Sequence, residues 1–524
     1  MLNMDKTMPK RVAHLASLLL FCGSVLTACA PLPALDTRQA SYALANNADT
    51  LIGKAILPST AVHPGLSGVH VLLDGRDAFA ARAMMADYAE RSLDVQYYIW
   101  RNDTTGSLLF AALRRAADRG VRVRLLLDDN NTVGLDGALA VLDAHPHIEV
   151  RLFNPFAMRK ARLLGFLGDF QRLNHRMHNK SFTMDGMVTV VGGRNIGNEY
   201  FDATGEMLFS DVDILAVGPA VGAIEQDFDR YWNSQSAYPA APLVGVSTAQ
   251  DIAQFDADAA RVAASAPAQA YLQAMHASTF VVDLDQRALP LEWAPVQVVS
   301  DDPAKALGRS APGSSVADKL PPMLGEPQRQ VNLVSPYFVP GPKWTPRLAA
   351  LAAGGVKVRI LTNSLEATDV AAVHAGYAKW RAELLRGGVA LYELKRAWRS
   401  EAAPVRSSAT LGGSASSLHA KTMAVDGTRV FVGSFNFDPR SVGLNTELGF
   451  VIESRTLAGM VGSVLDARLP SRAYEVRLSP QGKLYWIDRR ADGSVMRHDT
   501  EPGVGPWRRG TTGLMGLLPI DWML

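Results

Sequence analysis

The fold is decided by His178-Asn179-Lys180-Ser181-Phe182-Thr183-Met184-Asp185, a pattern that returns 241 residues later as His419-Ala420-Lys421-Thr422-Met423-Ala424-Val425-Asp426. Each copy leads into a second motif, Gly192-Gly193-Arg194-Asn195 in the first and Gly433-Ser434-Phe435-Asn436 in the second. The His, Lys, Asp and Asn of the two copies all keep the offset of 241. One structural unit is therefore used twice, and we expect the two motifs to meet at a shared cleft.

The segments before each motif also repeat one order of elements. In the first half we expect a helix at 108–119 and strands at 93–100, 121–127 and 148–153. In the second half we expect helices at 347–353 and 369–386 and strands at 331–339, 356–361 and 389–394. Alternating strands and helices predict parallel strands with crossover helices. The fold class is α/β, with two pseudo-symmetric α-β-α domains.

The composition is that of a globular protein. The chain has 524 residues, of which 48% are hydrophobic and 20% charged. This composition excludes a chain that is mainly disordered, collagen-like or coiled coil. The formal net charge of +2 gives no global basic field of the kind that duplex nucleic acid attracts. Because Cys22 and Cys29 are the only cysteines, a cysteine zinc site and a disulfide framework are excluded.

The N-terminus has the pattern of an export signal. Lys6, Lys10 and Arg11 precede an apolar stretch over 12–28 that ends in Leu26-Thr27-Ala28-Cys29. That tetrapeptide resembles the bacterial lipobox, which implies cleavage after residue 28 and a lipid on Cys29. The absence of Asp after the Cys favours the outer membrane, with the protein facing the periplasm. An uncleaved anchor with an incidental Cys is the alternative.

The repeated residues suit phosphoryl chemistry. Residues two apart in a strand share a face, so the His and Lys of each motif point the same way. Each half thus offers an imidazole, an ammonium and a carboxamide. Two Lys and two Asn can bind the negative charge of a phosphodiester transition state without a metal or another cofactor. One His can attack phosphorus while the other protonates the leaving alkoxide.

The motif His-x-Lys-x4-Asp-x6-Gly-(Gly/Ser)-x-Asn resembles the HKD signature of the phospholipase D superfamily, over about residues 65–524. The flanking stretches at 95–100, 172–180, 192–197, 335–338 and 517–521 are similar to bacterial cardiolipin synthases of the C-type branch. The resemblance implies two phospholipase D-like domains with a shared active-site cleft, formed within one chain that acts as a monomeric pseudo-dimer.

The resemblance also implies roles for single residues. It implies that His178 is the nucleophile and His419 the acid/base, and that Lys180 and Lys421 belong to the catalytic set. The motif residues Asp185 and Asp426 either belong to this set too or only brace the turn. Substrate-binding residues are expected at Asn195, Asn436, Gly193, Ser434 and Glu447. A carboxylate beyond each Asn would orient a histidine; Glu447 fits in the second half, whereas Asp211 and Asp213 both remain candidates in the first. Gly193 replaces the usual Ser, which would remove one hydrogen bond to phosphate.

Other segments have weaker signals. We expect His175 to be a solvated loop residue and Asp128-Asp129 to cap a strand or line the groove rim. The low-complexity stretch 402–417 is either a lid or a surface insertion. We expect the tail 514–524 to be a buried final strand, and contact of its Trp and Leu side chains with lipid is the alternative.

The expected organisation has six parts. They are a signal peptide at 1–28, a linker at 29–64, the first domain at 65–236, a connecting segment at 237–325, the second domain at 326–470 and a C-terminal segment at 471–524 that packs on the second domain. Within the connecting segment, residues 237–274 should be largely helical and 300–323 a loop.

Three classes of function compete. The first is a membrane phosphatidyltransferase that makes cardiolipin, with phosphatidylglycerol and phosphatidylethanolamine as candidate lipids. The second is a phosphodiesterase, either a phospholipase D or a nuclease, in which water is the acceptor. The third is a non-catalytic lipoprotein, which two intact motifs argue against. A nuclease should have a basic groove, so the near-neutral charge and lipid tether favour a phospholipid substrate over nucleic acid.

Overall fold

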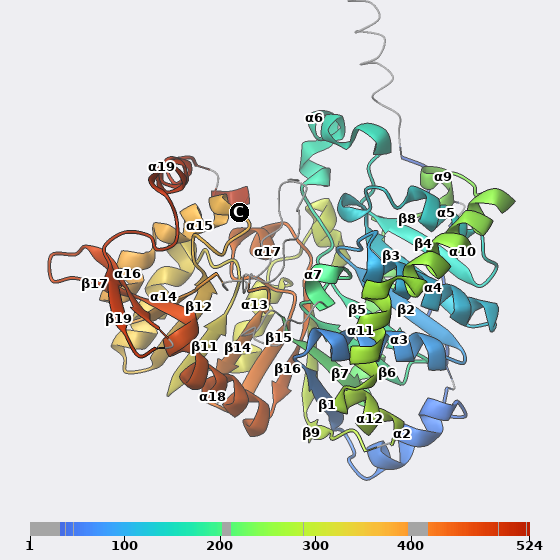
Figure 1. Ribbon diagram of the computed structural model, residues 1–524, viewed down its shortest axis with the longest axis horizontal. Coiled ribbons are helices and arrows are strands. Elements are labelled where there is room, and N and C mark those ends of the chain that lie inside the picture. Colours follow the sequence, from blue (N-terminus) through green and yellow to red (C-terminus); the bar gives the residue numbers. More distant parts are fainter. Residues whose placement is uncertain are drawn as a thin grey trace, which may run out of the picture.

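The computed structural model describes residues 32–201, 211–396 and 418–523, apart from residues 37, 46, 287, 491 and 520. The expected signal peptide, Cys29 and the segment 402–417 lie outside these ranges. Two mixed sheets stand side by side with helices around them, one sheet in each half of the chain (Figure 1). The α/β prediction is confirmed.

The first sheet has nine strands in the order β8-β4-β3-β2-β5-β6-β7-β1-β9. Strands β2, β3 and β4 pair in parallel, as expected, and the other pairs are antiparallel. The bounds are β1 Ser67–Leu72, β2 Ser92–Tyr97, β3 Arg122–Asp128, β4 Ile148–Phe153, β5 Ser181–Met184, β6 Val188–Gly192, β7 Asp213–Val217, β8 Ala237–Pro239 and β9 Glu292–Ala294.

The second sheet has ten strands in the order β10-β16-β15-β14-β11-β12-β13-β17-β18-β19. Its six strands from β16 to β13 repeat the order of β7 to β4, and β11, β12 and β13 are parallel. The bounds are β10 Val296–Ser300, β11 Gln330–Val334, β12 Lys357–Asn363, β13 Ala390–Leu394, β14 Thr422–Val425, β15 Arg429–Gly433, β16 Leu448–Glu453, β17 Ala473–Leu478, β18 Leu484–Arg489 and β19 Val495–His498.

Helices cover both sheets. Those of the first half and the connecting segment are α2 Leu51–Ala61, α3 Gly75–Tyr88, α4 Thr104–Asp118, α5 Asp136–Asp143, α6 Arg162–Leu173, α7 Asn198–Phe201, α8 Pro219–Trp232, α9 Ala241–Val244, α10 Ala249–Ala264, α11 Ala266–His276, α12 Thr279–Asp285 and α13 Val316–Leu324. Those of the second half are α14 Gly341–Ala353, α15 Ala371–Ala378, α16 Arg381–Arg386, α17 Pro439–Gly443, α18 Arg455–Arg472 and α19 Pro506–Met515. Within the described ranges, no helix is long and apolar enough to cross a bilayer.

One apolar core joins the halves. Val191 and Ile214, from β6 and β7, pack in the same buried cluster as Val432 and Phe450, from β15 and β16. Burial of such side chains is worth about 1.5–3 kcal/mol each, so the two sheets hold each other in place. The strands that form this core are the ones that follow the two motifs, and the core therefore fixes the motifs relative to each other.

Four expectations about local structure were wrong in detail. The helix expected at 369–386 is broken into α15 and α16, and the strand expected at 331–339 ends at Val334, before Ser335-Pro336. The expected loop at 300–323 contains α13, which begins where the Ser315 hydroxyl accepts a hydrogen bond from Asp318 N. The tail is not a buried strand: it continues from α19, and Leu517 is 81% exposed.

Candidate active site

The two motif segments are joined by backbone hydrogen bonds. His178 N donates to Thr446 O at 2.9 Å, and Thr446 N donates to Arg176 O at 2.9 Å. Thr446 belongs to the second half and directly precedes Glu447. This short parallel bridge places the first histidine against the start of β16, so the motifs meet as expected.

The histidine–carboxylate pairs are crossed between the halves. His178 Nδ1 lies 2.8 Å from Glu447 Oε2, and His419 Nδ1 lies 2.5 Å from Asp211 Oδ2. Each half thus supplies the carboxylate that orients the histidine of the other half. These contacts leave Nε2 of each ring as the atom able to react, because the carboxylate holds Nδ1.

Strand register resolves the open choice between Asp211 and Asp213. Gly192 pairs with Asp213 in the first sheet, and Gly433 pairs with Gly449 in the second. Two residues before each partner stand Asp211 and Glu447, which are therefore equivalent. Asp213 instead forms a buried ion pair with Arg82 at 2.7 Å.

The two carboxylates differ in protonation. Burial raises the pKa of Glu447 to about 7, although Lys180 and the hydroxyls of Ser434 and Ser441 oppose the shift. Burial acts on Asp211 in the same direction, but His419 and Lys421 outweigh it and lower its pKa to about 2. At neutral pH Asp211 is fully ionised, whereas Glu447 is near half protonation.

Burial lowers the pKa of both motif histidines. Burial, followed by the positive charges of Lys180, Lys421 and His419, lowers the pKa of His178 well below its usual value. Burial and Lys421 also lower the pKa of His419, while Asp211 opposes that shift. His419 therefore has an anionic partner that favours its protonated form, and His178 has a weaker one.

The two lysines bring positive charge into a buried space. Lys180 Nζ donates to His178 O at 2.5 Å, and Lys421 Nζ lies 3.1 Å from His419 Nδ1. Burial lowers the pKa of Lys180 to about 7 and that of Lys421 to about 8. An anionic ligand beside them would restore full protonation, because opposite charges favour the charged form. Across the described ranges, no three His, Cys, Asp or Glu side chains are grouped to hold a metal ion.

Each of the two motif asparagines has a buried amide atom without a hydrogen-bond partner among the described residues. Asn195 Oδ1 accepts a hydrogen bond from Ile99 N at 3.1 Å, while its Nδ2 is buried with no partner among the described residues. Asn436 Oδ1 is buried and, in the same part of the chain, also lacks a partner. Unpaired buried amide atoms are costly, so Asn195 Nδ2 is suited to donate to an anionic oxygen and Asn436 Oδ1 to accept from a hydroxyl or N–H group. The rings of Tyr98 and Tyr200 pack edge-on against His178 and His419.

Asp185 and Asp426 have contacts that fit the turn-bracing alternative to a catalytic role. Asp185 accepts hydrogen bonds from the backbone N–H groups of Glu90, Arg91 and Ser92 at 2.8–3.0 Å. Asp426 accepts the same three bonds from residues 328–330. Both stand at left-handed turn positions, with φ of 50° and 54°. Their carboxylates join each turn to the neighbouring chain and do not face the histidines.

Three more residues differ from what was expected of them. The Ser434 hydroxyl donates to Glu447 Oε2 at 2.5 Å, so it positions a carboxylate and is not directed at phosphate. At Gly193 an added Cβ would lie 2.1 Å from Asp211 Oδ1, which explains why no side chain stands there. His175 is buried rather than solvated, and its Nδ1 hydrogen-bonds to Gln171 O at 2.6 Å.

A matched pair of residues behind the motifs was missed. Asp128 ends β3, and its carboxylate accepts hydrogen bonds from Asn130 N at 2.9 Å, in the turn that follows, and from Met177 N at 2.7 Å. Asn363, at the end of β12, accepts one from Leu418 N at 3.1 Å. Each side chain therefore fixes the residue before a motif histidine. The repeat of 121–126 at 356–361 places these two residues in one register and could have revealed the pair.

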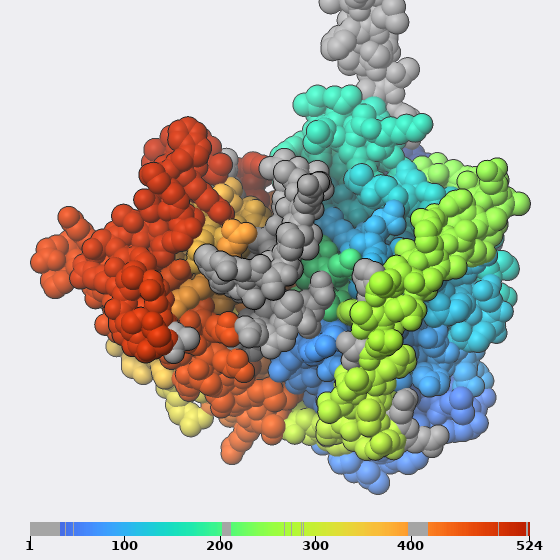
Figure 2. Space-filling model, in the orientation of Figure 1, coloured from blue at the N-terminus to red at the C-terminus, as the bar shows by residue number. Residues whose placement is uncertain are grey.

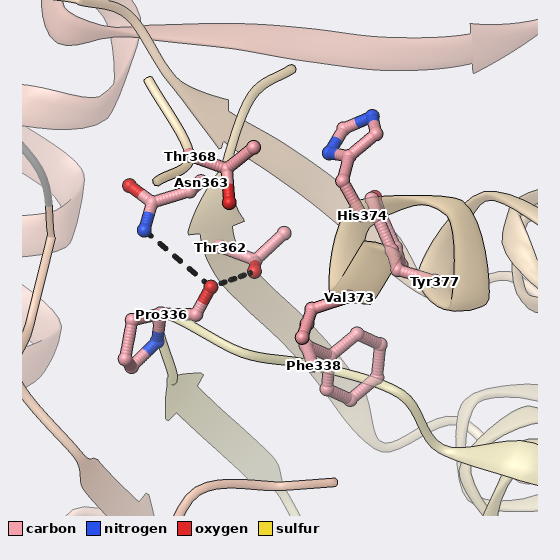
Figure 3. A pocket seen from close by; sticks show the side chains of 8 residues that line it. All are labelled: Pro336, Phe338, Thr362, Asn363, Thr368, Val373, His374 and Tyr377. Carbon is pink, nitrogen blue, oxygen red and sulfur yellow. Dashed lines mark hydrogen bonds between the residues drawn. The ribbon is translucent and has the colours of Figure 1, made fainter. Parts of the chain in front are cut away.

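Asn363 also lines a small pocket beside the second motif (Figure 3). Its Nδ2 donates to Pro336 O at 3.4 Å and to Leu418 O at 3.1 Å, and Thr362 Oγ1 donates to the same Pro336 oxygen. The other lining residues are Phe338, Thr368, Val373, His374 and Tyr377. The pocket wall thus links the end of β11 to the segment that presents His419.

Comparisons with known proteins agree with this geometry. A family profile described as "Cardiolipin synthase, PLD-like domain" matches residues 84–232 and 320–468. The chain is 48% identical to cardiolipin synthase C of Escherichia coli over 90% of this chain and 99% of that protein. It is 26% identical to the major cardiolipin synthase of Bacillus subtilis over 84% of this chain and 77% of that protein.

The fold is also that of a solved structure. Phosphatidylserine synthase of Haemophilus influenzae superposes with a TM-score of 0.51 at 14% identity, covering 80% of this chain and 92% of that one. The repeated motif, the repeated strand order and the match of the family profile to both halves lead to one conclusion. The chain belongs to the phospholipase D superfamily, within its family of cardiolipin synthase-like proteins.

Proposed function

We propose that this protein is a phosphatidyltransferase that makes cardiolipin through a phosphohistidine intermediate. The observation that carries the proposal is the crossed arrangement of two histidines and two carboxylates beside two buried lysines. Such a site can exchange one phosphodiester for another, and the protein's relatives named as cardiolipin synthases support a phospholipid as its substrate.

In the first half-reaction, Nε2 of neutral His178 attacks the phosphorus of a donor phospholipid. The bond from phosphorus to the headgroup oxygen breaks, and the headgroup alkoxide takes the Nε2 proton of protonated His419, which leaves that ring neutral. Lys180, Lys421, Asn195 and Asn436 would stabilise the charge on the non-bridging oxygens. The products are a phosphatidyl group on His178 and a free alcohol, which is glycerol or ethanolamine according to the donor.

In the second half-reaction, His419 is the base. It takes the proton of the free primary hydroxyl of phosphatidylglycerol, whose oxygen attacks phosphorus while the bond to His178 Nε2 breaks. Cardiolipin and the free enzyme result. One phosphodiester replaces another, so no activated donor is needed.

The unequal carboxylates support this division of roles. An acid/base histidine gives up a proton in the first half-reaction and takes one in the second, so it must be protonated in part of the cycle. Ionised Asp211 stabilises the imidazolium of His419. A nucleophilic histidine must be neutral when it attacks, which the lowered pKa of His178 favours. Glu447, with a pKa of about 7, holds that ring in place and adds little negative charge.

The acceptor decides between transfer and hydrolysis. Phosphatidylglycerol in a bilayer presents its hydroxyl at high local concentration, which favours transfer over attack by water. The second candidate is a phospholipase D-type hydrolase with the same covalent step, and a nuclease is less well supported because the net charge is only +2. We place the protein as a lipoprotein anchored through Cys29 and facing the periplasm, on the strength of the lipobox-like Leu26-Thr27-Ala28-Cys29.

Vesicles of phosphatidylglycerol and phosphatidylethanolamine, incubated with the full chain, test the proposal. Mass spectrometry should find cardiolipin together with released glycerol or ethanolamine. Phosphatidic acid as the main product would identify a hydrolase, and cleavage of an added oligonucleotide without lipid turnover would identify a nuclease. Cys29→Ser should leave a larger precursor that does not incorporate labelled palmitate; absence of label in the unmodified protein would refute the lipid anchor.

A further inference from the structure

Exposed apolar side chains gather in two segments, one from each half of the chain. Ten of the 24 large apolar side chains that are exposed in the described residues lie in α6 or in the tail from α19 onward. They are Leu163, Leu164, Leu167, Phe170, Trp507, Leu514, Met515, Leu517, Leu518 and Trp522. Figure 1 and Figure 2 show α6 and α19 projecting at the same edge of the molecule.

Each segment is amphipathic. In α6, Leu163 and Leu167 are one turn apart and are 84% and 85% exposed, while Phe166, between them in sequence, packs inward on Phe156. In α19, Trp507 and Leu514 are two turns apart on the outer face, and Thr512 is buried on the opposite one. The outer faces are therefore apolar although both helices have an inner face packed on protein.

One arginine ties the two segments together beside the active site. Arg440 of α17 donates to Asn174, the residue that ends α6, and to Met523 O at 3.1 Å in the tail. Asn174 is four residues before His178, and Arg440 is four residues after Asn436. The exposed apolar side chains of α6 and of the tail therefore lie next to the active site, α6 in the first half of the chain and the tail in the second.

Basic side chains border this surface. Residues 159–173 contain four basic side chains, of which Arg159, Arg162 and Arg172 form ion pairs with Asp129, Asp136 or Asp169. Lys160 is exposed, and Arg508 and Arg509 donate to backbone carbonyls at Thr368, Glu501 and Val504 rather than to carboxylates. Apolar helix faces edged with Lys and Arg are typical of surfaces that lie in the headgroup region of anionic membranes.

We propose that α6 and the tail from Trp507 to Trp522 form one docking surface for a bilayer containing anionic phospholipid, which seats the active-site rim on the lipid. The proposal rests on the proposed function for the identity of the substrate. It adds a contact independent of any N-terminal anchor: a substrate lipid would then pass from the leaflet to His178 between α6 and the tail.

Insertion can be measured with the full chain through its tryptophans. On vesicles of phosphatidylglycerol and phosphatidylethanolamine with brominated acyl chains, fluorescence should be quenched, and Trp507→Phe with Trp522→Phe should remove most of that quenching. Adding Leu167→Trp to this variant should restore it. Because the measurement follows single side chains, tethering by the N-terminus alone would give no quenching at these positions and would overturn the proposal.

Activity gives a second measurement. Leu163→Ser with Leu167→Ser should lower turnover of vesicle phospholipid at least tenfold, and should leave turnover of a monomeric short-chain phospholipid unchanged. Val246→Ser, which alters an exposed apolar residue far along the chain from both segments, is the matched control and should change neither. Equal losses on both substrates would refute docking.

Two further outcomes separate the alternatives. Quenching without any lipid turnover would refute the proposed function and leave the docking surface standing. If the unmodified chain dimerises, and the two serine substitutions abolish dimerisation without changing quenching or vesicle turnover, the surface is an interface between copies of the chain and the proposal fails.

Discussion

Asp211→Asn should damage catalysis far more than Glu447→Gln. Asp211 lies 2.5 Å from His419 Nδ1, and its cationic neighbours lower its pKa from 3.8 to about 2 despite its burial. A pKa unit is worth about 1.4 kcal/mol, so the ionised carboxylate gains about 2–3 kcal/mol from this setting. The asparagine keeps the shape and loses the charge that stabilises protonated His419.

The expected loss in kcat follows from that free energy. About 2–3 kcal/mol corresponds to about a hundredfold, and removal of the charge from a histidine-orienting aspartate costs about 10⁴-fold in a Ser-His-Asp triad. We therefore expect kcat of Asp211→Asn to fall by about 10² to 10⁴. Since Glu447 has a pKa of about 7, replacing it with neutral glutamine removes less negative charge than Asp211→Asn does. Glu447→Gln should therefore lower kcat about tenfold or less.

Rapid-quench measurements on mixed vesicles would separate the two half-reactions, with radiolabelled donor to follow the phosphatidyl-enzyme and cardiolipin. Asp211→Asn should slow both, because His419 serves as acid in one and as base in the other. Asp492→Asn, an exposed carboxylate near the β18–β19 turn, is the control and should behave as wild type. A larger loss in Glu447→Gln, or label found on His419, would reverse the assigned roles.

Other outcomes follow from the same site. His178→Ala and His419→Ala should each abolish lipid turnover, with a double variant no worse than either, because the two act as one unit; measurable activity in a single variant would contradict this. Turnover should survive chelation by EDTA, and its loss with recovery on adding a divalent ion would refute the metal-free reaction. As pH rises, Lys180 loses its proton near pH 7 and Lys421 near pH 8, so kcat/KM should fall from about pH 7 and kcat from a higher pH; a flat profile to pH 10 would argue against phosphate binding by the two lysines. Asp185→Asn should lower the free energy of unfolding by about 2–3 kcal/mol in urea titrations, and kcat per folded molecule should be retained.

Much of the fold could be predicted because the sequence repeats itself. The paired motifs indicated two equivalent units, and alternating strands and helices indicated the parallel strands of each sheet; β4 has the bounds expected from its apolar run. The tail differs from the predicted buried strand because its large apolar side chains are exposed. A spacing of seven between Trp507 and Leu514 fits one face of a helix equally well.

The orienting carboxylates were harder to predict. Asp211 follows Asn195 by 16 positions, whereas Glu447 follows Asn436 by 11, so the constant offset of 241 does not extend from the motif to the carboxylate. Only the pairing of β6 with β7 and of β15 with β16 restores the equivalence. That each carboxylate serves the other half's histidine is a tertiary contact, and no local pattern encodes it.

The crossed contacts explain how a symmetric fold can support an asymmetric reaction. Neither half supplies the carboxylate that orients its own histidine, so each half is incomplete without the other. The surroundings of the two carboxylates can therefore differ. In one, Gly193 leaves room for a short carboxylate that lies against the backbone and stays ionised beside His419 and Lys421. In the other, Ser434 and Ser441 hold a longer carboxylate whose pKa is near 7. Two histidines in similar backbone positions thus face different charges, which suits one to remain neutral and attack and the other to carry the proton.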